Sequence, residues 1–300
     1  MRVRKRQNLV KRAIKTLVFH LYYGNKSIRF ENDEKLPAYN FALRKASDHS
    51  AGVSAMLRVK NEASRILSCL DSIHDIFDEI IVVNNGSTDL TADLVQSFIK
   101  HRNATHIRLF DYPITIARCG KENEETSENS VHSLAYYYNW CLSKCTRRWV
   151  FKWDGDMVLP RSRKTAVIDL LARIQRSGLR LWNIRGQTVY IDPRGQPWAS
   201  LDEVNHEERC FPNSTMIYYK KEKNWERLKS PIAIPEEYPE ELAFYEIKDT
   251  SENEFAHWTD TSAISPRKQI EYRNFMHVKD SSPPGDRFEQ ISRTDIYLTD

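Results

Sequence analysis

The sequence is poor in glycine and cysteine, and it lacks any long apolar run. Its 300 residues include only 9 glycines and 5 cysteines. The cysteines are odd in number and form no Cys-x-x-Cys motif, which indicates a reducing compartment rather than a disulfide scaffold. No stretch of about 18 uncharged apolar residues occurs, so no segment is predicted to span a membrane. With 40% hydrophobic and 29% charged residues, the composition also excludes a disordered or collagen-like chain.

Acidic residues are missing from the first 30 residues, which carry nine of the 45 Lys and Arg side chains. The other 270 residues hold 36 basic and 41 acidic side chains. The net charge of +4 therefore belongs to an N-terminal arm, and the body of the chain is mildly acidic. Such a body has no electrostatic footprint for nucleic acid, which we do not expect as a partner.

Residues 8–22 predict an amphipathic helix within this arm. Apolar residues recur along it with helical spacing, and Lys11, Arg12 and Lys15 lie off that stripe. Its 15 residues reach roughly 22 Å, short of the roughly 30 Å of a bilayer's hydrocarbon core. A stripe flanked by cations favours an anionic membrane surface. We therefore expect a cytoplasmic protein held peripherally on the inner face of the cell membrane; a helix docked on the protein's own core is the alternative.

The body of the chain predicts an α/β fold. Strand patterns alternate with helical patterns from residue 53 onward, which favours an open, Rossmann-like, mostly parallel sheet with helices on both faces. Residues 31–50 read as an irregular linker, and no regular structure is predicted after residue 185. The predicted strands are 53–59, 79–83, 106–110, 149–153 and 180–184, and the predicted helices are 62–73, 89–100, 128–144 and 163–176.

Polar side chains follow the first two predicted strands. Asn61 and Glu62 come after the first, and Asn84 and Asn85 after the second, just before a Gly-Ser-Thr-Asp run. Open α/β sheets bind ligands beyond the carboxyl ends of their strands, so these residues are candidates for a nucleoside pocket. Capping of the next helix explains the Ser and Asp of that run, but not two consecutive Asn residues.

An acidic triplet, Asp154-Gly155-Asp156, follows the fourth predicted strand. Two carboxylates so close to a buried strand are costly unless a cation compensates them. Their oxygen atoms suit Mg²⁺ or Mn²⁺, which keep coordination positions open for phosphate oxygens. An exposed acidic turn is the alternative interpretation.

Together the segments VSAMLRVKNE, DEIIVVNNGSTDLT and WVFKWDGDMVLP resemble the nucleotide-sugar glycosyltransferases of family 2, which have the GT-A fold. The resemblance is good over residues 51–160 and loose over 161–260. It implies that Asp154 faces the ribose and the metal and that Asp156 is the main metal ligand. It also implies nucleotide-sugar contacts from Val59, Asn61, Glu62, Asn84, Asn85 and Asp154.

Two positions depart from the family pattern. Asn84 stands where the family has an Asp that accepts a hydrogen bond from a uracil ring, and an amide can accept or donate. The identity of the base is therefore open. Arg58-Val59-Lys60 replaces the common Pro-Thr-Tyr, which removes an aromatic ring that could stack on the base.

The resemblance implies a metal-dependent, inverting transfer in which a carboxylate takes the acceptor's proton. In the family that carboxylate comes from an acidic pair beyond the metal motif. The pairs Glu207-Glu208 and Glu236-Glu237 qualify, and we expect the base to be Glu237, with Glu208 second, although solvated surface acids are the alternative. The resemblance also implies that His257 approaches the metal; a packed histidine is the alternative.

These expectations define three regions: a basic arm and linker over 1–50, a GT-A-like catalytic domain over 51–260 and a C-terminal extension over 261–300. The predicted activity is sugar transfer from a nucleoside-diphosphate donor to a saccharide or lipid-linked acceptor, in cell-surface polysaccharide or lipopolysaccharide assembly. A sugar nucleotidyltransferase and a non-catalytic membrane-attached scaffold are the alternatives. A sugar nucleotidyltransferase requires a Gly-rich phosphate loop after the first strand, and the sequence has no glycine there.

Overall fold

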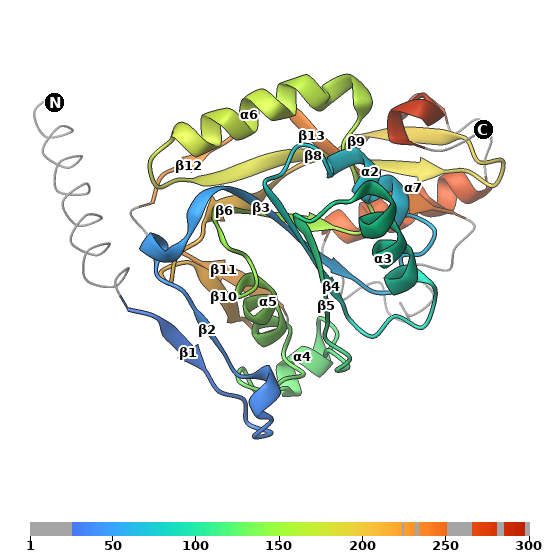
Figure 1. Ribbon diagram of the computed structural model, residues 1–300. Helices are drawn as coiled ribbons and strands as arrows, with labels where there is room; N and C mark the ends of the chain where they lie inside the picture. Colours follow the sequence, from blue (N-terminus) through green and yellow to red (C-terminus); the bar gives the residue numbers. More distant parts are fainter. Residues whose placement is uncertain (1–25, 224, 232–233, 251–265, 281–284, 298–300) are drawn as a thin grey trace, which may run out of the picture.

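The central feature of the fold is one large mixed sheet (Figure 1). The structure, a computed structural model, describes residues 26–223, 225–231, 234–250, 266–280 and 285–297. Within these residues the sheet has ten strands in the order β5-β4-β3-β6-β9-β8-β13-β7, with β12 beside β8 and β14 beside β9. The amphipathic helix predicted over residues 8–22 lies outside the described residues.

Four parallel strands form the first half of the sheet: β3 (Ser50–Val59), β4 (Glu79–Asn84), β5 (Ile107–Asp111) and β6 (Arg147–Asp154). All six residues of β4 are buried, as expected for a continuous apolar strand covered on both faces. These strands confirm the predicted α/β sheet. The carboxyl ends of β3 and β6 meet directly, because Arg58 pairs with Asp154 in the register.

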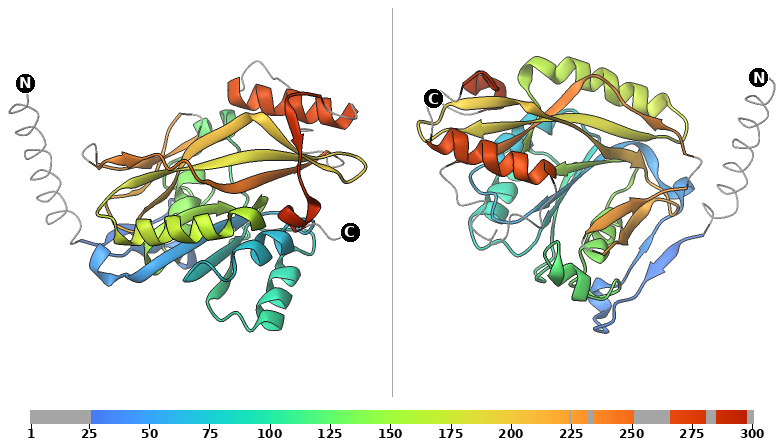
Figure 2. Two further views of the ribbon diagram at one scale, coloured as in Figure 1. Left: turned by 90° about the horizontal axis from the view of Figure 1, so that it is seen from above. Right: turned by 180° about the vertical axis from the view of Figure 1, so that it is seen from behind.

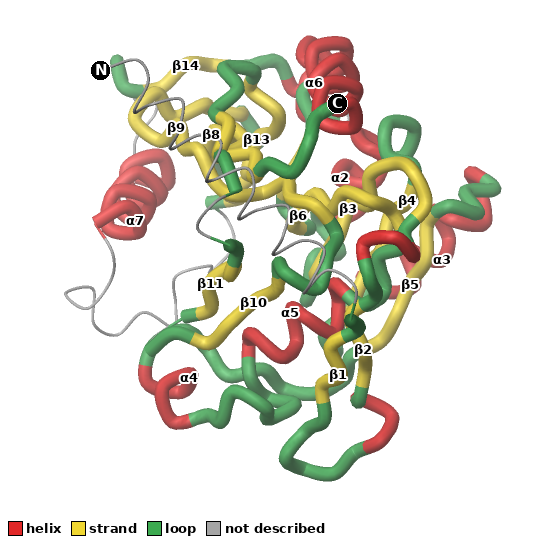
Figure 3. The backbone as a smooth tube through the Cα atoms, turned by 90° about the vertical axis from the view of Figure 1, so that its left-hand side faces the viewer, coloured by secondary structure: helices red, strands yellow, loops and turns green. Residues whose placement is uncertain are grey.

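Helices cover both faces of this half. On one face α2 (Ile66–Ile73), α3 (Thr91–Arg102) and α6 (Lys164–Arg176) bury their apolar sides in one core cluster. On the other, α5 (Leu134–Leu142) packs with the hairpin of β10 (Tyr218–Lys221) and β11 (Glu226–Lys229), which lies beside it in Figure 3. The short α4 (Lys121–Glu125) precedes α5, and 3-10 turns lie at Pro37–Tyr39, Ala46–Asp48, Arg161–Arg163 and Arg293–Ile296.

The second half of the sheet is built from long strands, of which the sequence predicted only the start of β8, over residues 180–184. β8 (Leu181–Ile191) and β9 (Pro197–Pro212) form an antiparallel pair, and β9 also pairs with β6. β13 (Leu242–Asp249) runs parallel to β8, and β7 (Met157–Val158) pairs antiparallel with β13. The two-residue β12 (Glu236–Glu237) lies beside the start of β8. Charged residues within β9 and β13 interrupt the apolar alternation, which hid these strands from the sequence analysis.

The C-terminal residues complete the second half. α7 (Pro266–Asp280) packs Phe275 and Val278 against Tyr190 of β8, and β14 (Phe288–Gln290) pairs with β9. In Figure 2, α7 and α6 lie on opposite faces of β8, β9 and β13. No helix in the described part of the chain is both long and apolar enough to cross a bilayer.

The sequence predicted an irregular linker over residues 31–50, whereas the structure has ordered elements there. β1 (Ile28–Phe30) and β2 (Phe41–Leu43) form an antiparallel pair. Phe41 and Leu43 are buried in the core cluster of α5, and the Phe30 and Phe41 rings are stacked. Strands of three residues are too short to give a periodic sequence pattern.

Candidate active site

A cleft of about 360 Å³ opens at the carboxyl ends of β3 and β6. Such a position is where open α/β sheets bind their ligands. Its walls come from the end of β3, the turn after β4, the start of α5, the acidic triplet and β13. The described residues that line it are Arg58, Val59, Lys60, Glu62, Asn85, Ile116, Leu134, Tyr137, Tyr138, Asp154, Gly155, Asp156 and Glu246.

The acidic triplet turns the chain at the end of β6 and points both carboxylates at this cleft. Asp154 is the last residue of β6, and β7 begins at Met157. A side chain at Gly155 would bring its Cβ to 2.9 Å from Cγ1 of Val59 and 2.9 Å from Cγ of Glu62. Glycine is therefore required between the two carboxylates because the neighbouring turn packs directly against it.

Asp154 is held by buried cations. Arg58 ion-pairs with its Oδ1, and Nη1 of Arg209 lies 2.8 Å from its Oδ2. Burial alone would raise the pKa of Asp154, but Arg58, Lys152 and Arg209 outweigh it and hold the pKa well below its usual range. Asp154 is therefore ionised, with both carboxylate oxygens engaged by guanidinium groups.

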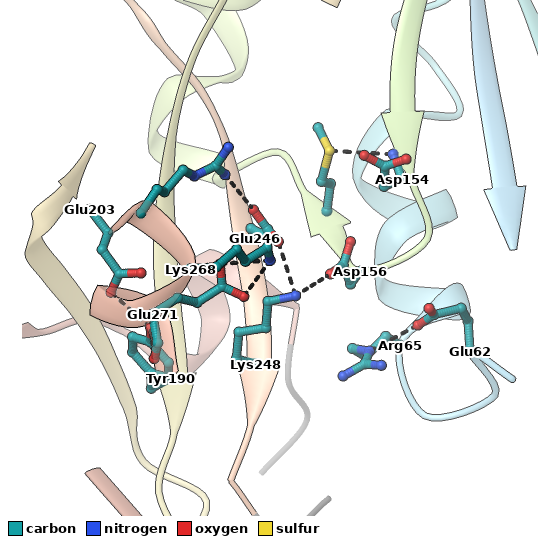
Figure 4. A network of polar contacts seen from close by, with 12 residues as sticks. Glu62, Arg65, Asp154, Asp156, Tyr190, Glu203, Glu246, Lys248, Lys268 and Glu271 are labelled. Carbon is teal, nitrogen blue, oxygen red and sulfur yellow. Dashed lines mark hydrogen bonds and ion pairs between the residues drawn. The ribbon is translucent and has the colours of Figure 1, made fainter. Parts of the chain in front are cut away.

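Asp156 has a different partner. Nζ of Lys248 lies 3.0 Å from its Oδ2 and 2.9 Å from Oε1 of Glu246, so one ammonium group joins the triplet to β13 (Figure 4). Burial would raise the pKa of Glu246, but Lys248, Lys268 and Arg209 lower it to about 2. Glu246 therefore faces the cleft as a carboxylate.

Glu62 brings a further carboxylate to the cleft. Its Oε2 lies 3.0 Å from Nε of Arg65, and its backbone N–H donates to Oγ1 of Thr91. Burial, and then the negative charge of Asp156, raise the pKa of Glu62 to about 7. The negative charge of Asp156 therefore makes the ionised form of the Glu62 carboxyl group less favourable.

Among the predicted nucleotide-sugar contacts, Val59, Glu62, Asn85 and Asp154 line the cleft. The Asn85 side chain is fixed because its Nδ2 donates to the carbonyl oxygens of Tyr112 and Ile114, both at 2.8 Å. This orientation is set by the loop after β5, so Asn85 is held in place before any ligand binds.

The other two asparagines hold the turns together, and the lining residues within the described chain do not include them. Asn61 has a positive φ of 57°, and its Oδ1 accepts from the backbone N–H of Thr88 at 2.8 Å. Asn84 donates through Nδ2 to Oδ1 of Asp111 at 3.0 Å and accepts from the N–H of Ser87. The Asn at position 84 therefore has a structural use: its amide pairs with the carboxylate at the end of the next strand.

The two predicted bases lie apart from the acidic triplet. Glu237 ion-pairs with Arg180 beside the start of β8, and each side chain is about 40% exposed. Glu208 is half-buried, and burial, together with the charge of Glu236, raises its pKa. The described cleft lining contains neither residue, and instead contains Glu246. The signal for Glu246 was the Glu-Ile-Lys sequence at 246–248, which follows directly on an apolar run at 242–245.

Sequence reasoning also missed a set of buried cations beneath the cleft. Cζ of Arg58 lies 3.8 Å from the centre of the Tyr138 ring, and Lys152 faces the same ring at 5.9 Å. Arg209, on β9, reaches Asp154 from the other half of the sheet. The detectable signal was an Arg in the apolar run VSAMLRV and a Lys in WVFKW.

The cleft suits a divalent cation that takes some of its ligands from a substrate. No three His, Cys, Asp or Glu side chains of the described chain form a complete metal site, and the predicted metal residue His257 lies outside the described residues. The charged residues of the described lining are two cations, Arg58 and Lys60, and four carboxylates, Glu62, Asp154, Asp156 and Glu246. A Mg²⁺-type ion would take one or two of these carboxylates as ligands and complete its coordination with phosphate oxygens.

Comparison with known sequences assigns most of the chain to one family. The model of the family described as "Glycosyl transferase family 2" matches residues 54–236. The SPbeta prophage-derived glycosyltransferase SunS of Bacillus subtilis (strain 168) is 28% identical over 106 residues, and the glycosyltransferase SunS of Bacillus phage SPbeta matches equally. The match covers 35% of this chain and 20% of each relative, so it spans only a fifth of their length.

Several solved structures are similar to part of the chain. The mannosyltransferase PcManGT from Pyrobaculum calidifontis, in complex with GDP-Man and Mn²⁺, is 20% identical with a TM-score of 0.35 and covers 45% of this chain and 36% of its own. S. aureus TarS 1–349 is 16% identical with a TM-score of 0.39, covering 66% and 60%. Glucosyl-3-phosphoglycerate synthase from Mycobacterium tuberculosis, with Mn²⁺, UDP and phosphoglyceric acid, is 22% identical with a TM-score of 0.30, covering 48% and 45%.

Proposed function

The chain belongs to glycosyl transferase family 2, and from this premise we propose its reaction. We propose that it moves a sugar from a nucleoside-diphosphate donor to a saccharide or lipid-linked acceptor, with inversion, using Mn²⁺ or Mg²⁺. Family membership favours this reaction over a sugar nucleotidyltransferase or a non-catalytic scaffold.

One observation carries the proposal: the carboxylates of Asp154 and Asp156 line the same cleft as Asn85 and Glu62. These residues come from three different strand ends, and only the fold brings them together. A carboxylate pair facing a polar pocket of this size suits a nucleoside diphosphate with a divalent ion.

In this proposal each group of residues in the cleft has a separate role. Asp156 is the metal ligand, and the ion, when bound, neutralises charge that develops on the leaving diphosphate. Asp154 orients Arg58 and Arg209, whose guanidinium groups favour negative charge in the cleft. Val59, Glu62 and Asn85 contact the nucleotide side of the donor. Tyr137 and Tyr138 of α5 line the cleft and supply aromatic rings, whereas Arg58-Val59-Lys60 at the end of β3 lacks the tyrosine of the family's Pro-Thr-Tyr.

The acceptor hydroxyl needs a carboxylate to take its proton. We propose Glu246 for this role ahead of Glu237 and Glu208, because geometry is the first requirement for a general base and Glu246 lines the cleft. Lys248 keeps Glu246 ionised, so this carboxylate is always available as a proton acceptor, although a pKa of about 2 makes it a weak base.

The pathway and the location belong to the same proposal. The basic, amphipathic segment 8–22 supports attachment to the anionic inner face of the cell membrane, where a lipid-linked acceptor or a growing cell-surface polysaccharide or lipopolysaccharide is assembled. Removal of residues 1–22 should release the protein from anionic vesicles in a co-sedimentation assay. Unchanged sedimentation of the shortened protein would refute the attachment.

Thermal unfolding in the presence of nucleotides tests the reaction class. UDP, GDP, ADP, CDP and dTDP are each added with and without Mn²⁺, and one of them should raise the Tm of the wild type more with the ion than without it. The same additions should not produce this Mn²⁺-dependent rise in Asp156→Ala. The proposal is wrong if no nucleotide stabilises the wild type, or if Asp156→Ala responds as the wild type does.

A further inference from the structure

A nearly buried lysine forms an ion pair with Asp156, the proposed metal ligand. Lys248 is only 4% exposed, and its Nζ lies 3.0 Å from Oδ2 of Asp156 and 2.9 Å from Oε1 of Glu246. Figure 4 shows its side chain reaching from β13 to a point between the carboxylates of Glu246 and Asp156. The carboxylate of Asp156 is therefore already paired with a cation from the protein itself, Lys248.

The backbone fixes this lysine in place. β13 pairs with β7 directly after the triplet, with Glu246 opposite Met157, and the N–H of Ile247 donates to the carbonyl oxygen of Asp156 at 2.8 Å. The strand that carries Lys248 is thus hydrogen-bonded to the turn that carries Asp156. This pairing holds the backbone of Lys248 beside the turn, so that its ammonium group lies within reach of Asp156.

The charges on either side of Asp156 set up a competition. The Lys248 ammonium group bridges Asp156 and Glu246, and the carboxylate of Glu62, paired with Arg65, lines the same cleft. A divalent ion that binds Asp156 without a nucleotide would be repelled by the positive charge of Lys248 at the same carboxylate. This repulsion is strong because the site is partly buried. The negative charge of a bound diphosphate would compensate both the divalent ion and the Lys248 ammonium group.

We propose that Lys248 is a built-in counter-ion that makes metal binding at Asp156 depend on the nucleoside diphosphate, so that ion and nucleotide enter the cleft together. This inference rests on the proposed function, because it assumes that Asp156 is the metal ligand. It makes Lys248 a positioning residue: it acts on the ion through Asp156 and need not touch the sugar.

The neighbouring ion pairs on α7 do not replace this contact. Nζ of Lys268 lies 2.7 Å from both carboxylate oxygens of Glu271, and Arg267 pairs with Glu207 at 2.5 Å. In the described part of the chain, Asp156 forms its ion pair with Lys248. The coupling should therefore respond to residue 248 and not to removal of a lysine charge in general.

The first experiment uses the wild type alone. Free Mn²⁺ is measured by electron paramagnetic resonance in titrations of the protein with and without each of UDP, GDP, ADP, CDP and dTDP. One nucleotide should tighten Mn²⁺ binding by about 100-fold, and by linkage Mn²⁺ should tighten that nucleotide by the same factor in calorimetry. Equal Mn²⁺ affinity with and without the bound nucleotide would overturn the inference, whether or not any variant folds.

The second experiment compares Lys248→Met with Lys164→Met, a control that removes a lysine 2.6 Å from Asp75 on another part of the surface. Lys248→Met should bind Mn²⁺ without nucleotide, and its coupling should fall below about 10-fold, while Lys164→Met should keep the wild-type value. Wild-type coupling in a folded Lys248→Met would contradict the inference. If no nucleotide binds the wild type at all, the proposed function fails; if one binds without coupling, only this inference fails.

Discussion

Nη1 of Arg209 lies 2.8 Å from Oδ2 of Asp154, and this ion pair joins the two halves of the sheet at the cleft. Arg209 belongs to β9 and Asp154 ends β6, and the Arg209 side chain is only 4% exposed. Asp154 also holds Arg58 of β3. The first carboxylate of the acidic triplet is thus surrounded by buried guanidinium groups, whereas the second, Asp156, is paired with a lysine. Two residues that look equivalent in the sequence have different environments.

The first prediction separates these two carboxylates. Asp154→Asn removes the carboxylate that pairs with Arg58 and leaves Arg209 with Glu207 as its remaining partner, so it should lower the free energy of unfolding by about 3 kcal/mol. Asp156→Asn should cost less stability but remove the Mn²⁺-dependent part of nucleotide stabilisation. Urea unfolding measures the first effect and Tm shifts measure the second. Asp202→Asn, at an exposed pair 4.0 Å from Arg287, is the control. Equal stability losses in the two triplet variants would contradict the distinction.

The parallel half of the fold could be predicted because its signals are local. Helical segments alternate with these strands along the chain, and the apolar run of β4 is uninterrupted. The long strands β8 and β9 pair with each other over most of their length, and β9 carries Glu207 and Arg209 where it passes the cleft. Those charges are stabilised by partners far away in the sequence, so no local pattern identifies β9 as a buried strand.

The same contrast holds within the candidate site. Asp154, Asp156, Glu62 and Asn85 follow strands directly, and the rule that ligands bind at strand ends was enough to select them. Glu246 and Lys248 reach the cleft only because β13 pairs with β7, a contact between segments about 90 residues apart. Asn61 and Asn84 lie at the predicted edge, but hydrogen bonds to the turns engage their amides, which the sequence pattern does not reveal.

The second prediction concerns Gly155. Alanine there would place its Cβ 2.9 Å from atoms of Val59 and Glu62, so the turn that carries Asp156 must shift. Gly155→Ala should lower the free energy of unfolding by about 1–3 kcal/mol and weaken Mn²⁺-dependent nucleotide binding. Gly178→Ala is a matched control because a Cβ there meets no atom of the described chain within 4 Å. Calorimetric titration and urea unfolding measure both effects, and identical behaviour of the two variants would refute the packing argument.

The third prediction tests the general base. Glu246→Gln should slow the release of nucleoside diphosphate from the nucleotide sugar that binds best by about 100-fold or more, because the amide cannot take a proton. Glu237→Gln, which loses only a half-exposed pair with Arg180, should keep its rate, and so should Glu208→Gln. Nucleotide affinity is measured in parallel, so that a loss of binding is not mistaken for a loss of the base. If Glu237→Gln or Glu208→Gln slows the release of nucleoside diphosphate and Glu246→Gln does not, the general base belongs to one of the acidic pairs instead.

The last prediction follows from Glu79, a buried carboxylate at the opposite end of β4 from the cleft. Oγ of Ser54 donates to its Oε2 at 2.5 Å, Thr146 donates through its backbone N–H and its hydroxyl, and Nη2 of Arg108 lies 2.6 Å from its Oε1. Burial would raise the pKa of Glu79, but the hydrogen bonds from Ser54 and Thr146 outweigh it and lower the pKa below its ordinary value of 4.5. Glu79 thereby joins β3, β4, β5 and the start of β6.

Because the folded-state pKa of Glu79 is lowered, the unfolded chain takes up the proton first as the pH falls. The contribution of Glu79 is therefore fully present above about pH 4.5 and is lost as the pH falls through the folded-state value. At pH 7 Glu79→Gln should lower the free energy of unfolding by about 1–3 kcal/mol, and the difference from the wild type should shrink below pH 4.5. Urea unfolding at several pH values measures this difference, with Glu125→Gln at an exposed helix pair as the control. A difference that stays constant from pH 7 to pH 3 would mean that the charge of Glu79 contributes nothing and that the effect of the substitution is one of shape alone.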